Sequence, residues 1–283
     1  MIKLFAMDMD GTLLNSNNEV NASSKEAIKK LNESGVKTVL CSGRVMTSLE
    51  NINAKLETDN PMVANNGAII KLNSKKILNI HPLEDDHLKE VIKFCHYHKF
   101  MYHFYDEDTF YSNRLDFNRL HHLKKDSQYG LNYQCNISIS DNPFQVMKEK
   151  DHNAMKILVG SLIDHPYGEK KSIELIKEEF KDKLYITSSG WGSIEIMEPH
   201  VNKWQGILEL IEFLGIKEDE IAAIGDSDND LPMISKSKLG FAMGNANDVV
   251  KNTASHIVSD NNSTGINEAA DLILKFNKDN PSV

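Results

Sequence analysis

The order of hydrophobic and polar positions changes several times near the start of the chain. Residues 2–7 (IKLFAM) are almost continuously apolar, which is typical of a strand buried on both faces of a parallel sheet. Apolar positions then recur at helical spacing until Gly35, and strand, helix and strand patterns follow at 36–44, 46–56 and 61–70. This β-α-β-α-β order predicts a parallel sheet with helices on both faces.

The same pattern returns near the end of the chain. Residues 202–215 (NKWQGILELIEFLG) predict an amphipathic helix, and residues 221–226 (IAAIGD) predict a short buried strand. In the middle of the chain, helix candidates alternate with aromatic-rich strand candidates. We therefore expect an α/β fold, with a Rossmann-like parallel-sheet core formed by residues 1–81 and 191–283 and an inserted α+β domain at 82–190. The helix candidates of the insert span 85–97, 114–124 and 166–180.

Composition and charge limit the functions that are open to the chain. The 283 residues carry a formal net charge of -9 and no basic block, so the sequence does not support a nucleic-acid footprint, and we expect a small-molecule partner. Three widely spaced cysteines, Cys41, Cys95 and Cys135, indicate neither a disulfide framework nor a zinc cluster. No apolar run approaches the roughly 18 residues of a membrane span, and an aspartate at position 8 leaves no room for a secretory signal. We expect a cytoplasmic protein without membrane partners.

Two aspartates follow the first predicted strand, where side chains emerge at the carboxyl edge of the sheet. Asp8 and Asp10 lie in the stretch DMDGT, where Gly11 permits a tight turn and Thr12 offers a hydroxyl and an amide. Two carboxylates this close repel one another unless a cation binds them, and Mg²⁺ is the natural hard divalent ion. An Asx-turn without chemistry explains the same residues, because aspartate and glycine are common in turns.

Two further stretches carry groups that suit a phosphate. In CSGR, Ser42 and Gly43 lie between a strand and a helix, where they either cradle a phosphate oxygen or simply connect the two elements. Lys203 opens the helix before the late strand. It offers a cation for a phosphoryl oxygen, or else a solvated surface charge.

A second acidic stretch, GDSDNDLPM, follows the late strand directly. Asp226 is expected at the same sheet edge as Asp8, and Asp228 and Asp230 add further carboxylates. Asn229 supplies an amide donor without charge. Carboxylates that converge on one edge require a cation, whereas a solvated acidic loop that caps the next helix is the alternative.

These four motifs, in this order, resemble those of the haloacid dehalogenase-like superfamily of phosphatases. The matching stretches are DxDGT at 8–12, SGR with Ser42, Lys203, and GDxxND at 225–230. The insert between the second and third motifs looks like that of the Cof-type group, which carries a cap domain there. The stretches NNGA, GNA and STGI are also similar to that group. The resemblance implies a hydrolase of phosphoric monoesters whose cap, residues 82–190, determines substrate specificity.

The resemblance also implies a role for each matching residue. Asp8 would be the nucleophile that forms an aspartyl-phosphate, and Asp10 would act as general acid and base. Mg²⁺ would be held by Asp8, the backbone carbonyl of Asp10 and Asp226. Asp230 would complete the metal site as an orienting group. Phosphate oxygens would meet the Met9 amide, Thr12, Ser42, Gly43, Lys203 and Asn229.

Substrate recognition is expected in the insert, which closes over the core in the Cof-type group. Arg114 and Arg119 lie there, and the planar guanidinium suits an anionic group of the substrate, although surface ion pairs are the common role of such arginines. Arg44, Asn66 and Gly67 complete the predicted substrate-binding set.

The resulting prediction is a Mg²⁺-dependent phosphatase of a small phosphorylated metabolite. The classes that we consider are a sugar phosphate, a nucleotide, flavin mononucleotide and pyridoxal phosphate. A phosphomutase or phosphotransferase of the same superfamily is one alternative, and a non-catalytic regulatory binding protein is another. A monomer is expected because the insert already covers the sheet edge, and a homodimer stays open.

The sequence departs from the family pattern beside the lysine, in EPHVNKWQG. His200 and Trp204 occupy places that are often held by glycine. We expect Trp204 to pack in the core, because large aromatic residues at helix starts are usually buried. The role of His200 is left open.

Overall fold

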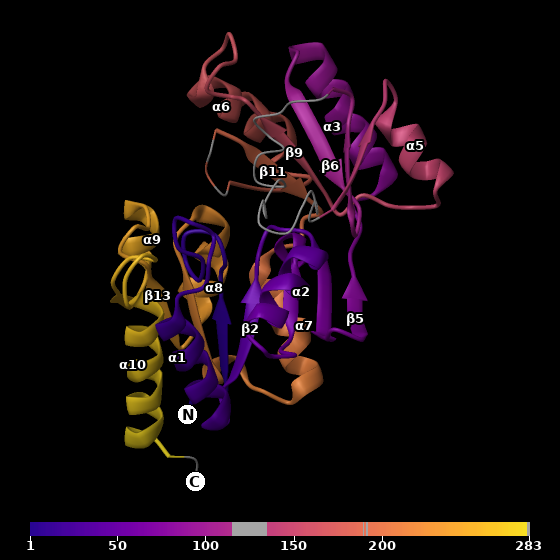
Figure 1. Ribbon diagram of the computed structural model, residues 1–283. Helices are drawn as coiled ribbons and strands as arrows, with labels where there is room; N and C mark the ends of the chain where they lie inside the picture. The colour runs from indigo at the N-terminus through magenta and orange to yellow at the C-terminus, as the bar shows by residue number, and fades with distance from the viewer. Residues whose placement is uncertain (115–134, 189, 191, 282–283) are drawn as a thin grey trace. The chain divides into compact units, whose positions relative to one another are not determined.

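The computed structural model describes residues 1–114, 135–188, 190 and 192–281 of the chain (Figure 1). The chain divides into two compact units, which we call the core unit and the insert unit. The core unit comprises Met1–Gly43, Leu49–Asn79 and Asn202–Val283, and the insert unit comprises Arg44–Ser48 and Ile80–Val201.

Within the described residues, the core unit is built on an eight-stranded sheet in the order β14-β13-β12-β1-β2-β3-β4-β5. β1 (Leu4–Met7) runs parallel to both neighbours, with Leu4 paired to Ile221 on one side and to Lys37 on the other. All four residues of β1 are buried, as its continuous apolar run predicts. The other strands are β2 (Lys37–Cys41), β3 (Met62–Ala64), β4 (Ile69–Asn73), β5 (Lys76–Ile80), β12 (Ile221–Gly225), β13 (Leu239–Ala242) and β14 (His256–Ile257).

The parallel pairing predicted from the sequence is confirmed from β14 to β3. β4, in contrast, pairs with β3 in antiparallel orientation. A short 3₁₀ turn, η1 (Asn65–Gly67), reverses the chain between them, with Asn65 and Asn66 at φ angles of 48° and 56°. Asparagine adopts this left-handed conformation more readily than most other residues. The hydrophobicity of residues 61–70 therefore does not reveal that the chain reverses direction within this run.

Helices of the core unit pack in two groups. α1 (Ala22–Glu33) packs against β2 and lies beside α10 (Gly265–Asp279), although the two helices come from opposite ends of the sequence (Figure 1). α7 (Lys203–Leu214) packs against β3, β4 and α8 (Leu231–Lys236), and α8 covers β12 and β13. The remaining helical elements are α2 (Met46–Lys55), η2 (Glu218–Glu220), η3 (Asp228–Asp230) and α9 (Asp248–Thr253).

The strand order of the core sheet reverses at β1. The chain proceeds from β1 through β2 to β3 on one side, and from β12 through β13 to β14 on the other. Open α/β sheets bind ligands at the carboxyl ends of the strands that flank such a switch point. Asp8 follows β1 directly and Asp226 follows β12, so the topology brings these two residues to the same sheet edge.

The insert unit has a sheet of its own, with six strands among the described residues in the order β10-β11-β9-β6-β7-β8. Alternate strand residues join the apolar sides of three helices in one buried cluster. The predicted helix at 114–124 lies outside the described residues, apart from Arg114. The elements are α3 (Asp85–His98), β6 (Met101–Tyr105), β7 (Thr109–Ser112), β8 (Asn136–Ile139), α5 (Pro143–Glu149), β9 (Lys156–Gly160), α6 (Glu169–Phe180), β10 (Tyr185–Thr187) and β11 (Ile194–Met197).

The C-terminal boundary of the insert unit differs from the boundary expected from the sequence. That division assigned residues 191–283 to the core, whereas the insert unit continues to Val201. The reason is β11, which pairs in antiparallel orientation with both β9 and β10. Its alternating pattern indicates a strand but does not say which sheet the strand joins.

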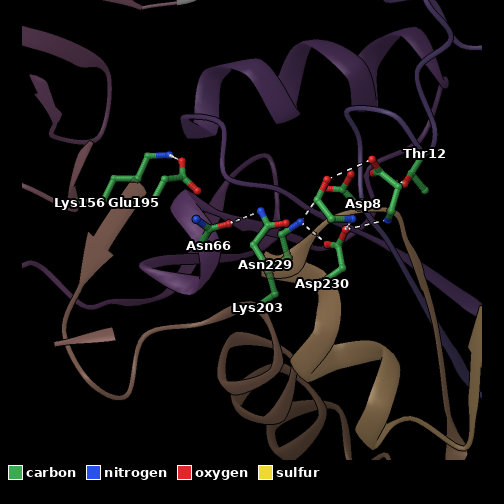
Figure 2. Close-up of polar contacts among 10 residues, drawn as sticks. Asp8, Thr12, Asn66, Lys156, Glu195, Lys203, Asn229 and Asp230 are labelled. Carbon is green, nitrogen blue, oxygen red and sulfur yellow. Dashed lines mark hydrogen bonds and ion pairs between the residues drawn. The ribbon is translucent and has the colours of Figure 1, made fainter. Parts of the chain in front are cut away.

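A buried ion pair lies on the face of the insert sheet that the three helices do not cover. The Lys156 ammonium contacts the Glu195 carboxylate, and both side chains are buried (Figure 2). Both residues alternate with members of the apolar cluster, which places them on the opposite side of their strands. Among the described residues, no helix has the length and apolar character required to cross a lipid bilayer.

Candidate active site

Lys203 lies between two carboxylates at the carboxyl edge of the core sheet (Figure 2). Its Nζ donates to Asp8 Oδ1 at 2.5 Å and to Asp230 Oδ1 at 2.6 Å. Lys203 and Asp230 are 0% exposed, and Asp8 is 5% exposed. Lys203 is the first residue of α7, and Asn202 caps this helix by accepting from the Gln205 amide. The lysine is therefore a buried, paired cation and not a solvated surface charge.

The acidic segment after β12 is held by its own backbone. Asp230 Oδ2 accepts from the amides of Asp226 at 2.9 Å and Ser227 at 3.1 Å. Asp226 accepts from Thr12 Oγ1 at 3.0 Å and from Ser227 Oγ at 3.1 Å. The Thr12 hydroxyl thus donates a hydrogen bond to the carboxylate cluster. Ser227 was not among the predicted site residues, because a serine within an acidic turn carries no distinctive sequence signal.

Carboxylate oxygens of Asp8, Asp226 and Asp230 all lie within 4.8 Å of one another. Three carboxylates and one ammonium leave an excess of negative charge in a largely buried site, which is unfavourable unless protons or a cation compensate for it. Oxygen ligands at this separation suit a hard divalent cation. The residues therefore fit a metal site. The acidic cluster identified among the described residues does not include the Asp10 carboxylate.

Burial and mutual repulsion raise the pKa values of these carboxyl groups. The pKa of Asp8 lies well above its usual value, first because the group is buried and then because Asp230 repels its charge, while Lys203 opposes the shift. Burial and Asp230 also raise the pKa of Asp226 to about 6. Burial alone would lower the pKa of Lys203, but the attraction of Asp230 and Asp8 outweighs it and holds that pKa above its ordinary value. The lysine is therefore charged.

Two glycines allow the turns to approach the carboxylates closely. Gly11 has a φ of 75°, and a Cβ there would lie 2.5 Å from Asp226 Oδ2. A side chain on Gly225 would overlap the Asp230 carboxylate. Gly11 thus satisfies two requirements at once, a left-handed backbone and close contact with a charged side chain.

Asn66 joins the η1 turn to the acidic segment. Asn229 Nδ2 donates to Asn66 Oδ1 at 3.1 Å, and both side chains are buried (Figure 2). The Asn66 amide donates to the Ser42 carbonyl at 3.0 Å. Gly67 has a φ of 106°, and a Cβ there would overlap the Asn202 carbonyl. Asn66 and Gly67, which the sequence assigned to the substrate, therefore connect the SGR turn, the acidic segment and the start of α7.

The other predicted residues of the DMDGT and CSGR stretches differ in their exposure. The Met9 side chain is buried, whereas Asp10 is exposed at the turn. Ser42 is buried and Gly43 is partly exposed, directly after β2. Arg44 belongs to the insert unit, where its Nη1 donates to a neighbouring serine hydroxyl at 3.2 Å.

Of the two predicted insert arginines, the structure describes one. It also describes both residues near the start of α7 that differ from the family pattern. Arg114 is exposed in the insert unit, and Arg119 lies outside the described residues. Trp204 is 2% exposed, so the prediction that it packs in the core is confirmed. The His200 ring packs edge-on against His81, with ring centroids 5.6 Å apart and an interplanar angle of 89°.

Comparison with known proteins agrees with this arrangement. A sequence profile described as haloacid dehalogenase-like hydrolase matches residues 5–269. The chain is 30% identical over 282 residues to YxeH of Bacillus subtilis (strain 168), an alignment that covers 97% of this chain and 99% of YxeH. It is 28% identical over 269 residues to a second protein of that organism, named 5-amino-6-(5-phospho-D-ribitylamino)uracil phosphatase YcsE, with 95% of this chain and 94% of YcsE covered.

The fold is also shared with solved structures. A haloacid dehalogenase-like hydrolase from B. subtilis superimposes with a TM-score of 0.83 at 23% identity, covering 96% of this chain and 99% of that one. The open sheet, its switch point and the buried lysine between carboxylates form an α/β arrangement that is suited to phosphoryl transfer. The chain belongs to the haloacid dehalogenase-like hydrolase family. Within that family it is a hydrolase of phosphoric monoesters.

Proposed function

We propose that the chain is a Mg²⁺-dependent phosphatase of a small phosphorylated metabolite and that Asp8 forms an aspartyl-phosphate during turnover. The observation that carries this proposal is the placement of the Lys203 ammonium between Asp8 and Asp230, beside Asp226. A buried, fixed cation beside a candidate nucleophile is suited to the charge that develops on a transferred phosphoryl group.

Asp8 is the residue best placed for nucleophilic attack. It directly follows the central strand β1, and its Oδ1 is oriented by Lys203. Attack by the other carboxylate oxygen on phosphorus would form the Asp8 acyl phosphate and break the bond to the leaving alkoxide. Water would then attack phosphorus and regenerate the carboxylate. Two steps with lower barriers would replace one difficult displacement.

Asp10 is the proposed general acid and base. Asp10 is exposed on the turn, where it would be accessible to the leaving group of a bound substrate. It would give a proton to the alkoxide in the first step and accept one from water in the second. Phosphate oxygens would be met by the Met9 amide, Ser42, Gly43, Lys203 and Asn229, with Thr12 acting through Asp226 as well.

The carboxylates of Asp8 and Asp226 and the backbone carbonyl of Asp10 would hold Mg²⁺, with Asp230 orienting the set. When bound, the ion would supply positive charge that helps to neutralise the phosphoryl oxygens. The raised pKa values of Asp8 and Asp226 support this assignment, because a nearby cation favours the ionised carboxylates that nucleophilic attack requires.

The proposed substrate is small, and its organic part would be recognised by the insert unit, which we propose as the cap domain. YcsE is named for a phosphorylated ribitylamino-pyrimidine, which supports a metabolite of that size. Arg44, Arg114 and Arg119 remain proposed contacts for an anionic group, together with Asn66 and Gly67. The proposed enzyme is cytoplasmic and acts as a monomer.

The test is phosphate release from a panel of sugar phosphates, nucleotides, flavin mononucleotide and pyridoxal phosphate with Mg²⁺. Wild type, Asp8→Asn and a chelator control would be compared on each substrate. The proposal predicts release by the wild type that is lost in both controls. No release from any substrate by folded protein contradicts it and favours a transferase or a binding protein. Release that needs a bisphosphate activator favours a mutase.

A further inference from the structure

Two asparagines that lie outside the four motifs in the sequence hold the backbone of the turn that follows β1. Asn245 Nδ2 donates to the Gly11 carbonyl at 2.8 Å. Asn261 Nδ2 donates to the Leu14 carbonyl at 2.7 Å. The two are joined, since the Asn261 amide donates to Asn245 Oδ1 at 3.1 Å. We call Asn245 and Asn261 the asparagine latch.

The orientation of both side-chain amides follows from their partners. A backbone N–H only donates, so the atom of Asn245 that faces the Asn261 amide must be its oxygen, which leaves the nitrogen for Gly11. A backbone carbonyl only accepts, so the nitrogen of Asn261 faces Leu14. Each latch residue therefore uses its amide N–H group to hold one carbonyl of the turn.

Amides of the latched turn also donate to the carbonyls of the two residues that follow β1. The amides of Thr12 and Leu14 donate to the Met9 carbonyl at 3.3 and 2.8 Å, and the Leu13 amide donates to the Asp8 carbonyl at 3.3 Å. Three N–H groups of the turn are thus satisfied by the two residues that follow β1. Its Gly11 and Leu14 carbonyls are satisfied by the latch, which fixes the turn from the other side.

The segment between these carbonyls carries the chemistry of the turn. Asp10 precedes Gly11, and Thr12 follows it and donates its hydroxyl to Asp226. Gly11 itself lies against Asp226, with no room for a Cβ. A rotation of the Gly11–Thr12 peptide would therefore move Asp10, Thr12 and the contact with Asp226 together. Glycine adopts several backbone conformations readily, so a hydrogen bond to the Gly11 carbonyl limits the conformations that are open to the turn.

We propose that the asparagine latch is a positioning device that keeps Asp10 and the Thr12–Asp226 contact in their working geometry. Its effect on turnover rests on the proposed phosphatase activity, whereas its effect on metal affinity rests only on the metal site of Asp8, Asp226 and Asp230. Neither asparagine touches the reacting groups; both act through the backbone of the turn. Groups that orient metal ligands and acid–base residues in this way typically contribute about 10- to 100-fold to activity or metal affinity.

A matched pair of isosteric variants tests the latch. Asn245→Asp keeps the oxygen that accepts from the Asn261 amide but loses the donor to Gly11. The control is Asn262→Asp, the same change at a neighbour that is exposed, as Asn245 is. Asn262 uses its oxygen, which accepts from the Ser16 amide at 2.9 Å, so its hydrogen bond survives the change. Both variants add one negative charge near the site, and Asn245→Ala removes the donor without a charge.

The readouts are Mg²⁺ affinity of the metal-free protein by calorimetry, kcat and KM on the best panel substrate, and the unfolding temperature. We expect Asn245→Asp and Asn245→Ala to lower kcat and Mg²⁺ affinity about 10- to 100-fold, with little change in KM, while Asn262→Asp stays within about twofold of wild type. Asn261→Asp is expected to act in the same direction, and the Asn245→Asp/Asn261→Asp double variant to be less than additive because both residues hold one turn.

The latch is overturned if both Asn245 variants match Asn262→Asp in kcat and Mg²⁺ affinity. A lower unfolding temperature with unchanged kcat and unchanged affinity overturns it too, since that result describes a purely structural bond. Absence of wild-type phosphate release would contradict the proposed function alone, because the calorimetric comparison of the Asn245 and Asn262 variants still decides the fate of the latch.

Discussion

The Lys203 ammonium lies 2.5 Å from a carboxylate oxygen of Asp8, and both residues are removed from solvent. Lys203 opens α7 and Asp8 directly follows β1, so the pair joins two elements that are far apart in the sequence. A buried cation in such a position holds the candidate nucleophile and also offsets the negative charge of the surrounding carboxylates.

Replacing Lys203 tests this pairing directly. Lys203→Met keeps an apolar stem of similar length but leaves Asp8 and Asp230 without their shared cation. Removal of one partner of a buried ion pair typically costs about 3–5 kcal/mol, part of which the carboxyls recover here by taking up protons. We expect a fall of at least about 100-fold in kcat/KM and a lower urea midpoint. Lys203→Arg should not restore activity. The guanidinium is larger and planar, and the fully buried position of the lysine does not accommodate it. Near-wild-type activity in Lys203→Met would contradict the assignment.

Gly11 offers a test that separates backbone strain from disturbance of the site. Gly11 and Gly215 have similar φ angles of 75° and 66°, but only Gly11 has a neighbour where a Cβ would stand. Both Gly→Ala changes should cost about 1–2 kcal/mol of stability through left-handed backbone strain. Gly11→Ala should also displace Asp226 and lower kcat/KM at least about 10-fold. Equal kcat/KM values in the two variants would show that the contact between Gly11 and Asp226 has no role in activity.

The raised pKa of Asp226 predicts a pH dependence of Mg²⁺ binding. In the metal-free protein this pKa is about 6, so the carboxyl is mostly ionised at pH 7.5 and mostly protonated at pH 5. Because the ion binds the carboxylate form, Mg²⁺ affinity should fall as the pH drops through about 6, and binding near pH 6 should release protons. Calorimetry in two buffers with different ionisation enthalpies measures both quantities. Affinity that is constant from pH 5 to 7.5 contradicts the prediction.

His87 and Glu198 predict a pH-dependent contribution to the stability of the insert unit. The two lie 2.8 Å apart, and the hydrogen bond to Glu198 raises the pKa of His87 in the folded state. A histidine with a raised folded pKa contributes stability that is present below its unfolded pKa, about 6.5, and is lost as the pH rises through the folded value. His87→Gln should therefore destabilise the protein at pH 6 and have a smaller effect at pH 8.5, as measured by urea unfolding. An equal loss of stability at both pH values would rule out this linkage.

The sequence was sufficient to predict that the two acidic motifs lie at one edge of the sheet, because each follows a strand whose hydrophobic pattern is clear. Asp8 and Asp226 end continuous apolar runs, and parallel strands bring their carboxyl ends to one edge. The burial of Trp204 followed from its size. These predictions depend on local pattern and on rules of topology, which a single sequence contains.

Contacts between distant side chains were not predictable in the same way. The bond from Asn229 to Asn66 depends on the left-handed turn after β3, and the contacts of Asn245 and Asn261 with the first turn depend on how three loops meet. The assignment of β11 to the insert sheet depends on strand pairing, which alternation of apolar residues does not specify. In each case the missing information is the spatial register between segments.

Detection of the covalent intermediate on Asp8 tests the central claim most directly. The wild-type enzyme would be mixed with its best panel substrate and Mg²⁺, quenched in acid within milliseconds, digested and examined by mass spectrometry. The account predicts a phosphorylated peptide that contains Asp8, is cleaved by hydroxylamine as an acyl phosphate, and is absent from Asp8→Asn and from chelator-treated enzyme. Substrate turnover by Asp8→Asn at the wild-type rate, or a phosphoryl group found on another residue, would contradict it.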